Sequence, residues 1–321
     1  MKNYVCGRSN LALTVQVPYD CPNSCPFCTA KAKYQKEKPN YARVARAMYD
    51  ALYENDLPIV DVVFSGGEPS ANIGKLASLI NIVPESKNVY INTTLLASTF
   101  EEFYTLVKSE KKIKGVNISR HSATYEEDCK LFHNIATDEQ IEKLASITSV
   151  RINVVLYKDV DIEAIVSRWE NHKVNSVSFR EDFRKVKTER DLREPNGFTD
   201  RLRNLYNGWY SGGCNVCNTE VHAKGDLSIR YHRGFENTLL DRGDYYEYND
   251  VIIEPNGEVL LDWEYSSENL MHYSRMLSSN RINNQPIYEP SYTYGGYCGI
   301  NPCGIRPFSY CGRSSCGGSH C

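Results

Sequence analysis

The sequence predicts an α/β protein with a partial, TIM-like (β/α)6 barrel and a cysteine-rich C-terminal extension that contains β-hairpins. Two observations predict the barrel. Short apolar runs rich in Val and Ile alternate with segments of helical spacing, which is the pattern of parallel βα units. Six such runs are too few for a closed barrel of eight strands. A third observation predicts the extension, because Tyr, Gly, Asn and Cys become frequent beyond Leu205 while helical spacing fades.

The predicted strands are apolar, β-branched runs of strand length. They cover residues 11–17, 59–64, 88–93, 115–119, 150–156 and 174–179. Segments of helical spacing connect them across residues 41–52, 73–82, 100–107, 137–144 and 162–169. The helix that begins near Thr137 opens with Thr-Asp-Glu-Gln, a capping-box pattern. A parallel sheet built in this way carries its chemistry at the carboxyl ends of its strands.

Two turns predict hairpins in the extension. Lys224-Gly225-Asp226 and Pro255-Asn256-Gly257 each stand beside short apolar runs, and Asn-Gly between such runs is a good hairpin signal. We therefore predict two domains. Residues 1–205 form the partial barrel, and residues 206–321 form the extension, which is expected to close the barrel and to set specificity.

The composition excludes some classes of protein. Of 321 residues, 41% are hydrophobic and 24% are charged, which is ordinary for a globular protein. The 37 Lys and Arg against 40 Asp and Glu give a net charge of −3, so nothing indicates general nucleic-acid or membrane binding. The N-terminus leads into no signal-like apolar region, and no apolar run is of membrane-spanning length. We therefore expect a cytoplasmic protein whose 12 cysteines serve metal or redox chemistry rather than disulfides.

Three cysteines with C-x3-C-x2-C spacing follow the first predicted strand: Cys21, Cys25 and Cys28. Cysteine thiolates are the usual ligands of a [4Fe-4S] cluster, and three of them leave the fourth iron open to another ligand. A zinc clip and buried free thiols are the alternatives. Structural zinc takes four ligands, however, and the sequence offers no fourth one nearby. The spacing therefore favours a reactive cluster.

Further polar residues follow the next predicted strands. Gly66-Gly67-Glu68-Pro69 follows the second strand, Asn92 and Thr93 end the third, and Ser119-Arg120-His121 ends the fourth. Because the carboxyl ends of parallel strands share one edge of the sheet, we expect these residues and the three cysteines to form a single active site.

The cysteine spacing with Phe27 before the third cysteine, together with Gly66-Gly67-Glu68-Pro69 after the next strand, resembles the radical SAM enzymes over residues 10–182. The resemblance implies that the cluster binds S-adenosylmethionine (SAM). One electron would cleave SAM to methionine and a 5′-deoxyadenosyl radical, which abstracts a hydrogen from the substrate. It also implies an electron donor such as flavodoxin or ferredoxin. The substrate stays open among a nucleotide, a small metabolite and a peptide. The alternative is a non-catalytic iron–sulfur or zinc protein that acts as a redox carrier or scaffold.

The resemblance also implies contacts to SAM. The backbone around Phe27 is expected to hold the adenine, and Asn92 and Thr93 to contact the ribose hydroxyls. Glu68 is expected to accept from the ammonium group, and Arg120 to pair with the carboxylate. The expected set also includes Ser65, Gly66, Gly67 and Ser119, since glycine lets the backbone approach a ligand.

Catalytic roles are predicted for Arg120 and for His121, the latter as an acid–base group. Structural alternatives stand beside these roles. Strand-end capping explains Asn92, Thr93 and Ser119 equally well, and His121 could be a hydrogen-bonded structural histidine.

Two subgroups of the radical SAM enzymes look closest. Residues 64–69 and Cys28-Thr29-Ala30-Lys31 are similar to the viperin type, which acts on a nucleoside triphosphate. Residues 151–156 and Ser178-Phe179-Arg180-Glu181 are similar to the molybdenum-cofactor cyclase type, which acts on GTP. Such short matches recur in peptide-modifying maturases, so they leave the substrate open.

The extension departs from the cyclase type, whose extension has a C-x2-C-x13-C trio. Cys214 and Cys217 match the first pair, but Tyr231 stands at the third position. The pair could hold an auxiliary iron–sulfur cluster, a zinc ion together with His222 and His232, or no metal. Cysteines of the tail could complete a cluster or lie in a flexible Gly-rich end: Cys298, Cys303, Cys311 and Cys316.

Two arginines, Arg230 and Arg233, flank His232 in the first predicted hairpin. They could bind a phosphate or carboxylate group of the substrate. A solvated strand face is the alternative.

Overall fold

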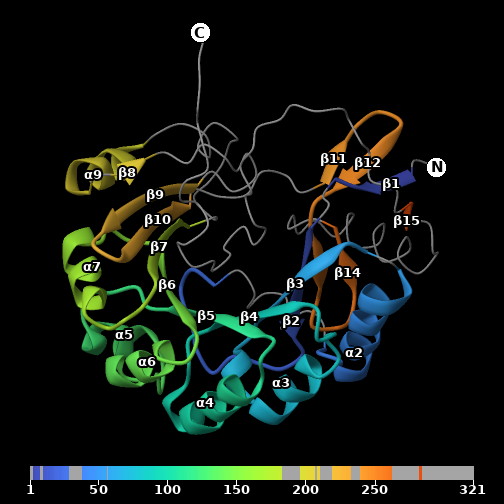
Figure 1. Ribbon diagram of the computed structural model, residues 1–321, viewed down its shortest axis with the longest axis horizontal. Coiled ribbons are helices and arrows are strands. Elements are labelled where there is room, and N and C mark those ends of the chain that lie inside the picture. The colour runs from blue at the N-terminus through green and yellow to red at the C-terminus, as the bar shows by residue number, and fades with distance from the viewer. Residues whose placement is uncertain are drawn as a thin grey trace.

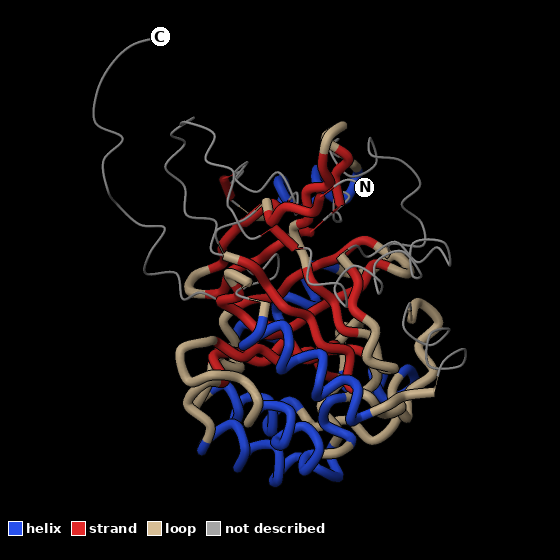
Figure 2. The backbone as a smooth tube through the Cα atoms, turned by 90° about the vertical axis from the view of Figure 1, so that its right-hand side faces the viewer, coloured by secondary structure: helices blue, strands red, loops and turns tan. Residues whose placement is uncertain are grey.

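The structure, a computed structural model, describes residues 3–7, 10–28, 38–55, 57–182, 196–206, 208–209, 219–232, 239–261 and 282–283. The chain forms a curved sheet of largely parallel strands with helices along its outer side (Figure 1). Figure 2, turned by 90°, shows most of the helices gathered on one side of the strands. The predicted α/β partial barrel is confirmed, and among the described strands the barrel is not closed.

All six predicted strands are present, and each pairs in parallel with its neighbour. They are β2 (Leu11–Val17), β3 (Ile59–Gly66), β4 (Asn88–Thr93), β5 (Ile113–Ser119), β6 (Ser149–Leu156) and β7 (Ser176–Glu181). The five predicted helices are also present. They are α2 (Tyr41–Tyr49), α3 (Ile73–Ile80), α4 (Phe100–Ser109), α6 (Asp138–Ala145) and α7 (Ile162–Glu170). Thr137 and Gln140 form the predicted capping box of α6.

Helix α5 (Tyr125–Leu131) was not predicted, because its seven residues are mostly polar and lack a clear apolar period. A signal was available, however. Thr124 is followed three residues later by Glu127, and the Thr124 side chain accepts a hydrogen bond from the Glu127 N–H at the start of the helix. A short π-helix (Asp50–Glu54) continues α2.

The segments beyond Leu205 add strands to both ends of the same sheet. Strand β10 (Leu227–His232) pairs in parallel with β7, and β13 (Val251–Ile253) pairs in parallel with β2. Strand β9 (Thr219–Lys224) forms a hairpin with β10, and β14 (Val259–Leu260) forms a hairpin with β13, as the two turns predict. Helix α9 (Gly197–Leu205) and β8 (Gly208–Trp209) lie between β7 and β9 in the chain. The predicted division at residue 205 therefore falls within a single sheet.

The second hairpin packs closely on α2. The Asn40 N–H at the start of α2 donates to the Pro255 carbonyl at 2.8 Å. Gly257 has φ +86°, and a Cβ atom there would lie 2.5 Å from Arg43 Cβ. Only glycine combines this backbone conformation with so close an approach, so the Asn-Gly turn serves both the hairpin and its packing.

A second, small sheet has the order β11-β12-β1-β15, and the sequence did not predict it. It combines β1 (Asn3–Cys6) with β11 (Leu239–Asp241), β12 (Tyr245–Tyr248) and β15 (Ile282–Asn283). These strands are two to four residues long, too short for a period of two to stand out.

The two faces of the main sheet differ in polarity. Alternate residues on each strand belong to the hydrophobic core that includes the helices, as Val15, Phe64, Ile118, Ile152 and Phe179 do. The residues between them face the concave interior, because successive side chains of a strand point to opposite faces. These inner residues are largely polar and include Gln16, Ser65, Asn92, Asn117, Asn153 and Ser178. The interior of the barrel is therefore suited to a polar ligand.

Within the described part of the chain, no helix combines the length and the apolar character that a membrane span requires.

Candidate functional site

The three cysteines lie in the loop that follows β2. Cys21 and Cys25 are partly buried, Cys28 is exposed, and none of the three forms a disulfide. Burial raises the pKa of Cys21 to about 11 and that of Cys25 to about 12, and repulsion between the neighbouring sulfurs adds to both shifts. Gathering three thiolates is therefore unfavourable unless a positive group compensates, and bound iron provides such a charge. The donor set thus fits an iron–sulfur cluster.

Among the described residues, no three His, Cys, Asp or Glu side chains converge to hold a metal ion. A cubane cluster places each thiolate on a different iron, so its ligands need not converge on one point.

Asn23, which the sequence did not indicate as a site residue, fixes the cysteine loop to two other segments. Its Nδ2 donates to Thr94 Oγ1 at 3.0 Å, and its Oδ1 accepts from the His133 N–H at 2.8 Å. Its own N–H points at Cys21 Sγ at 3.4 Å. The available signal was an Asn within the cysteine loop. The sequence could not show its partners, because they are distant in the chain.

The Gly66-Gly67-Glu68-Pro69 turn packs directly on the residues that precede Cys21. Gly66 has φ +98°, and a Cβ atom on Gly67 would lie 2.2 Å from the Tyr19 carbonyl oxygen. The Tyr19 hydroxyl donates to the Pro69 carbonyl at 2.9 Å. The sequence predicted that these glycines let the backbone approach a ligand. In the structure, Gly67 permits the approach of the chain's own backbone.

Glu68 is 1% exposed, and its carboxylate ties the turn to the end of β4. Oε1 accepts from the Ser70 N–H at 2.9 Å, from the Ser70 hydroxyl at 2.9 Å and from the Thr93 hydroxyl. Oε2 accepts from the Thr94 N–H at 2.7 Å and from its hydroxyl at 2.5 Å. These donors occupy the carboxylate, and the predicted contact with the SAM ammonium group stays a prediction.

Asn92 and Ser65 lie together on the inner face of the sheet. Asn92 Nδ2 donates to Ser65 Oγ at 3.4 Å, and Asn117 Nδ2 donates to Asn92 Oδ1 at 2.6 Å. Ser119 stands on the same face of β5, in register with Asn153. Asn92, Ser65 and Ser119 thus line the interior, whereas Thr93 faces Glu68.

Arg120 is 0% exposed and donates to three backbone carbonyls. Nη1 reaches the carbonyls of Thr94 and Ser119 at 2.7 Å each, and Nη2 reaches that of Ala136 at 2.8 Å. Burial lowers its pKa to about 10. These contacts join the ends of β4 and β5. The predicted carboxylate partner is not among them, and the roles in SAM binding and catalysis stay predictions.

His121 is buried and acts as a hydrogen-bond acceptor. Its Nδ1 accepts from the Val155 N–H at 2.9 Å, and its ring meets the Phe27 ring edge-on at 4.7 Å. Burial, followed by the charge of Arg120, lowers its pKa to about 3. The imidazole is therefore neutral, with its proton on Nε2. These contacts are those of the structural alternative, and the acid–base role stays a prediction.

A network of charged side chains fixes the backbone of His121. The buried Asp128 accepts from the His121 N–H at 2.8 Å and pairs with Arg168 of α7 at 2.7 Å. Arg168 also pairs with Asp138 at 2.8 Å. Phe27 is enclosed from the other side by Tyr157, whose ring centre lies 4.8 Å away. The cysteine loop is thus held by packing as well as by hydrogen bonds.

We call the ends of β2 to β5 with these loops the cysteine side. It brings together the cysteine loop, the Gly66–Pro69 turn, Thr94, Arg120 and His121, as the shared strand edge predicts. The other predicted metal ligands lie outside the described residues: Cys214, Cys217, Cys298, Cys303, Cys311 and Cys316. Arg233 also lies outside them.

The register of the first hairpin bears on the proposed Cys2His2 zinc site. His222 pairs across the strands with Ile229, and His232 pairs with Thr219. Because Ile229 and His232 are three residues apart on β10, the two histidines project from opposite faces of the hairpin. His222 Nδ1 lies 3.3 Å from the Tyr206 carbonyl oxygen on the outer side. This arrangement does not support a zinc ion shared by both histidines.

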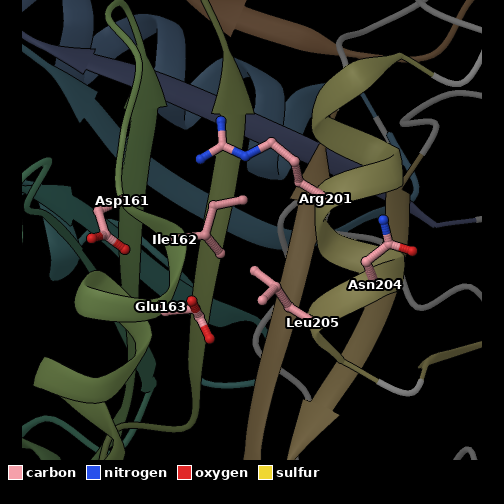
Figure 3. Close-up of a pocket in the computed structure, with 6 residues that line it drawn as sticks. All are labelled: Asp161, Ile162, Glu163, Arg201, Asn204 and Leu205. Carbon is pink, nitrogen blue, oxygen red and sulfur yellow. The ribbon is translucent and has the colours of Figure 1, made fainter.

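A surface pocket of about 260 Å³ lies between α7 and α9 (Figure 3). Its lining residues are Asp161, Ile162, Glu163, Arg201, Asn204 and Leu205. None of them is a predicted site residue. Arg201 pairs with Asp159 at 2.7 Å beside it, so the polar groups here serve contacts between the outer helices.

Comparisons with known proteins agree with this site. Residues 12–127 match the family model of a 4Fe-4S single cluster domain. This range contains the site residues of the cysteine side from Cys21 to His121. A search of curated proteins finds no match.

Solved structures share the fold. SuiB of Streptococcus suis bound to the precursor peptide SuiA has a TM-score of 0.54 and 16% identity, over 86% of this chain and 65% of that chain. SuiB bound to S-adenosylmethionine has a TM-score of 0.53 and 16% identity, over 86% and 66%. The protein anSMEcpe with bound AdoMet and Cp18Cys peptide has a TM-score of 0.53 and 14% identity, over 86% and 81%. The chain thus spans about two thirds of the length of SuiB.

The match to a 4Fe-4S single cluster domain supports the predicted [4Fe-4S] cluster on the cysteine loop. The solved structures support the partial-barrel fold that the resemblance to the radical SAM enzymes implies.

Proposed function

We propose that this protein is an enzyme that cleaves SAM reductively at a [4Fe-4S] cluster held by Cys21, Cys25 and Cys28. When bound, the cluster and SAM supply a 5′-deoxyadenosyl radical that abstracts a hydrogen from the substrate. One observation carries the proposal: the cysteine loop and the Gly66–Pro69 turn are locked together at the carboxyl edge of the sheet. A simple electron carrier has no need of a second turn fixed so closely against its cluster loop.

The chain's own residues position the reactants. Asn23 and Phe27 hold the cysteine loop against the ends of β4 and β5, which supports a fixed arrangement of the loop that carries the three thiols. Ser65 and Asn92 present hydroxyl and amide groups on the inner face beside that loop, where they are suited to the polar groups of SAM. Preorganised groups of this kind bind without a large cost of ordering.

For the substrate, we propose a peptide or a small molecule. SuiB is seen with a precursor peptide and anSMEcpe with the Cp18Cys peptide, and both share this fold. The polar interior of the barrel supports a polar substrate or a polar segment of one. Flavodoxin or ferredoxin is the proposed electron donor, and residues 206–321 are proposed to set specificity.

The test is anaerobic reconstitution with iron and sulfide, followed by SAM and dithionite. We expect about four irons per chain for one cluster, or about eight if the extension holds a second. We expect 5′-deoxyadenosine as the product measured by mass spectrometry. Cys25→Ala should abolish both cluster absorbance and product. The matched control is Cys129→Ala, because Cys129 is exposed on α5, and it should behave as the wild type.

The alternative makes a different prediction. A non-catalytic carrier or scaffold would bind about four irons and be reduced by dithionite, yet release no 5′-deoxyadenosine from SAM. That result would overturn the enzymatic proposal.

A further inference from the structure

The inner face of β6, β7 and β10 carries a concentration of positive side chains that the cysteine side lacks. We call it the cationic wall and define it by Arg151 on β6, Arg180 on β7, and Arg230 and His232 on β10. Figure 1 places β7 and β10 on one arm of the curved sheet and β2 and β3 on the other. The wall thus lies on the arm away from the strand that leads to the cysteines.

Strand register places these side chains on one face. Arg180 pairs in register with His232, and Ser178 pairs with Arg230. Arg151 pairs with Ser176, which pairs with Ser228. Residues in register on neighbouring parallel strands share a face and are adjacent. The alternate residues of β7 and β10, such as Phe179 and Ile229, belong to the hydrophobic core on the helix side. The wall therefore faces the interior.

Burial and spacing suit the wall to a ligand inside the barrel. Arg151 is 1% exposed and His232 is 2% exposed, whereas Arg180 and Arg230 are half-buried nearer the mouth. Serines stand between the arginines. Arg151 Nε donates to Ser176 Oγ at 3.2 Å, and Arg230 Nε lies 3.5 Å from Ser228 Oγ. Guanidinium and hydroxyl groups on one surface are the donors that bind carboxylate and phosphate oxygens.

Among the described residues, the interior carries acidic groups on both arms. Asp61 lies on β3 and accepts from Asn88 at 2.8 Å, and Glu254 follows β13 and accepts from Gln16 at 3.1 Å. Asp182, buried just beyond β7, brings one carboxyl group to the end of the wall. The inner faces of β6, β7 and β10 carry three guanidinium groups, and positive charge gathered on one surface attracts anions.

We propose that the cationic wall is a substrate subsite that binds an anionic group, a carboxylate or a phosphate. The proposal rests on the proposed function and narrows its substrate class to molecules that carry such a group, for example an acidic peptide side chain or a phosphorylated small molecule. Arg180 and Arg230 contact the anion near the mouth, beside His232, which is in register with Arg180, and Arg151 forms the base of the subsite. The substrate atom that reacts then lies toward the cysteine side.

The test measures anion binding to the reconstituted protein with SAM, without turnover and at constant ionic strength, since salt screens exposed charges. The probes are glycerol 3-phosphate for a phosphate, glutarate for a carboxylate, and glycerol as the uncharged control. We expect saturable binding of at least one anion and none of glycerol. The anion with the lower Kd identifies whether the subsite binds a phosphate or a carboxylate. Arg180→Gln and Arg230→Gln should each weaken its Kd about tenfold, which corresponds to about 1.4 kcal/mol.

Two controls keep the result interpretable. Arg46→Gln removes an exposed arginine of α2 that pairs with Asp50, and it should keep the wild-type Kd. Arg180→Lys keeps the positive charge and should weaken binding less than Arg180→Gln does. The proposal fails if the wild type binds neither anion saturably. It also fails if both Gln variants keep the wild-type Kd, or if Arg46→Gln loses as much as they do.

The two proposals fail separately. Wall-dependent anion binding by a wild type that forms no 5′-deoxyadenosine would overturn the enzymatic function alone. Formation of 5′-deoxyadenosine by a wild type that binds neither anion would overturn the subsite alone.

Discussion

The cysteine side and the cationic wall use buried polar groups in different ways. On the cysteine side, the carboxylate of Glu68 and the guanidinium of Arg120 are bonded to groups of the chain itself. On the wall, Arg180, Arg230 and Arg151 stand at different levels on the inner face of three neighbouring strands. The first arrangement fixes loops, and the second lines the interior with positive side chains. Under our two proposals, the first arm holds the cofactor in one position and the second binds an anionic group of the substrate.

If the cysteine side is a rigid assembly, the largest effect should come from its tightest contact. Gly67→Ala would place a Cβ atom 2.2 Å from the Tyr19 carbonyl oxygen, where the neighbour is backbone and cannot move alone. We expect a loss of about 3 kcal/mol in the free energy of unfolding and of most bound iron. Urea unfolding and iron analysis measure both. The control is Gly74→Ala in α3, where the nearest atom is 3.9 Å away, and it should be neutral or stabilising. Normal iron content in Gly67→Ala would show that the turn does not support the cysteine loop.

The cysteine side was the more predictable of the two because its signals are contiguous. Three cysteines within eight residues and a Gly-Gly-Glu-Pro turn could be recognised before any contact was known. What those residues touch could not be predicted. The contact of Glu68 with Thr94 depends on how β3 and β4 are placed, so the sequence could not predict it, while the expected contact of Glu68 with a ligand stays a prediction.

The wall had no contiguous signal at all. Its arginines are far apart in the sequence, one on each of three strands: Arg151, Arg180 and Arg230. Only the pairing of β10 with β7 brings Arg180 and Arg230 together. The sequence predicted the β9–β10 hairpin but could not predict which strand it joins. The same register separates His222 from His232, which spacing alone had allowed to share a zinc ion.

The second prediction tests whether Arg120 is structural. Arg120→Gln removes the donors for the carbonyls of Thr94, Ser119 and Ala136 in a fully buried position. Leaving such groups without partners should cost about 3 kcal/mol in the free energy of unfolding, measured by urea denaturation. A variant as stable as the wild type, but with weaker SAM binding, would instead favour the predicted role of Arg120 at the SAM carboxylate.

The third prediction concerns the tether of the cysteine loop. Asn23→Ala removes the bonds to Thr94 and to the His133 N–H, and should cost about 2 kcal/mol in the free energy of unfolding. The rate of iron loss to a chelator should rise, because the loop that carries the cysteines is less restrained. Ser24→Ala changes an exposed neighbour in the same loop and should leave both quantities unchanged. Equal rates of iron loss in Asn23→Ala and Ser24→Ala would show that Asn23 does not restrain the cysteine loop.

The fourth prediction uses the pKa of His121, which burial lowers from 6.5 to about 3. Between these values the unfolded chain binds a proton that the folded chain does not, so stability is present above pH 6.5 and is lost as the pH falls toward 3. One such group contributes at most about 1.4 kcal/mol per pH unit. His121→Gln should flatten the decline in unfolding free energy between pH 6.5 and 5. Parallel profiles for wild type and His121→Gln would mean that the imidazole is charged in the folded protein.

The smallest effect on stability is expected on the wall, where the same substitution as at Arg120 can be compared directly. Arg230 is half-buried, whereas Arg120 is fully buried. Arg230→Gln should change the free energy of unfolding by less than about 1 kcal/mol, while it weakens anion binding. Urea denaturation of Arg120→Gln and Arg230→Gln measures the loss in the free energy of unfolding for each variant. A loss at Arg230 as large as that at Arg120 would mean that the wall holds the barrel together rather than presenting charge to a ligand, and the contrast between the two arms would disappear. A small loss would show that removing a positive charge from this arm leaves the fold intact, as a surface built for a ligand requires.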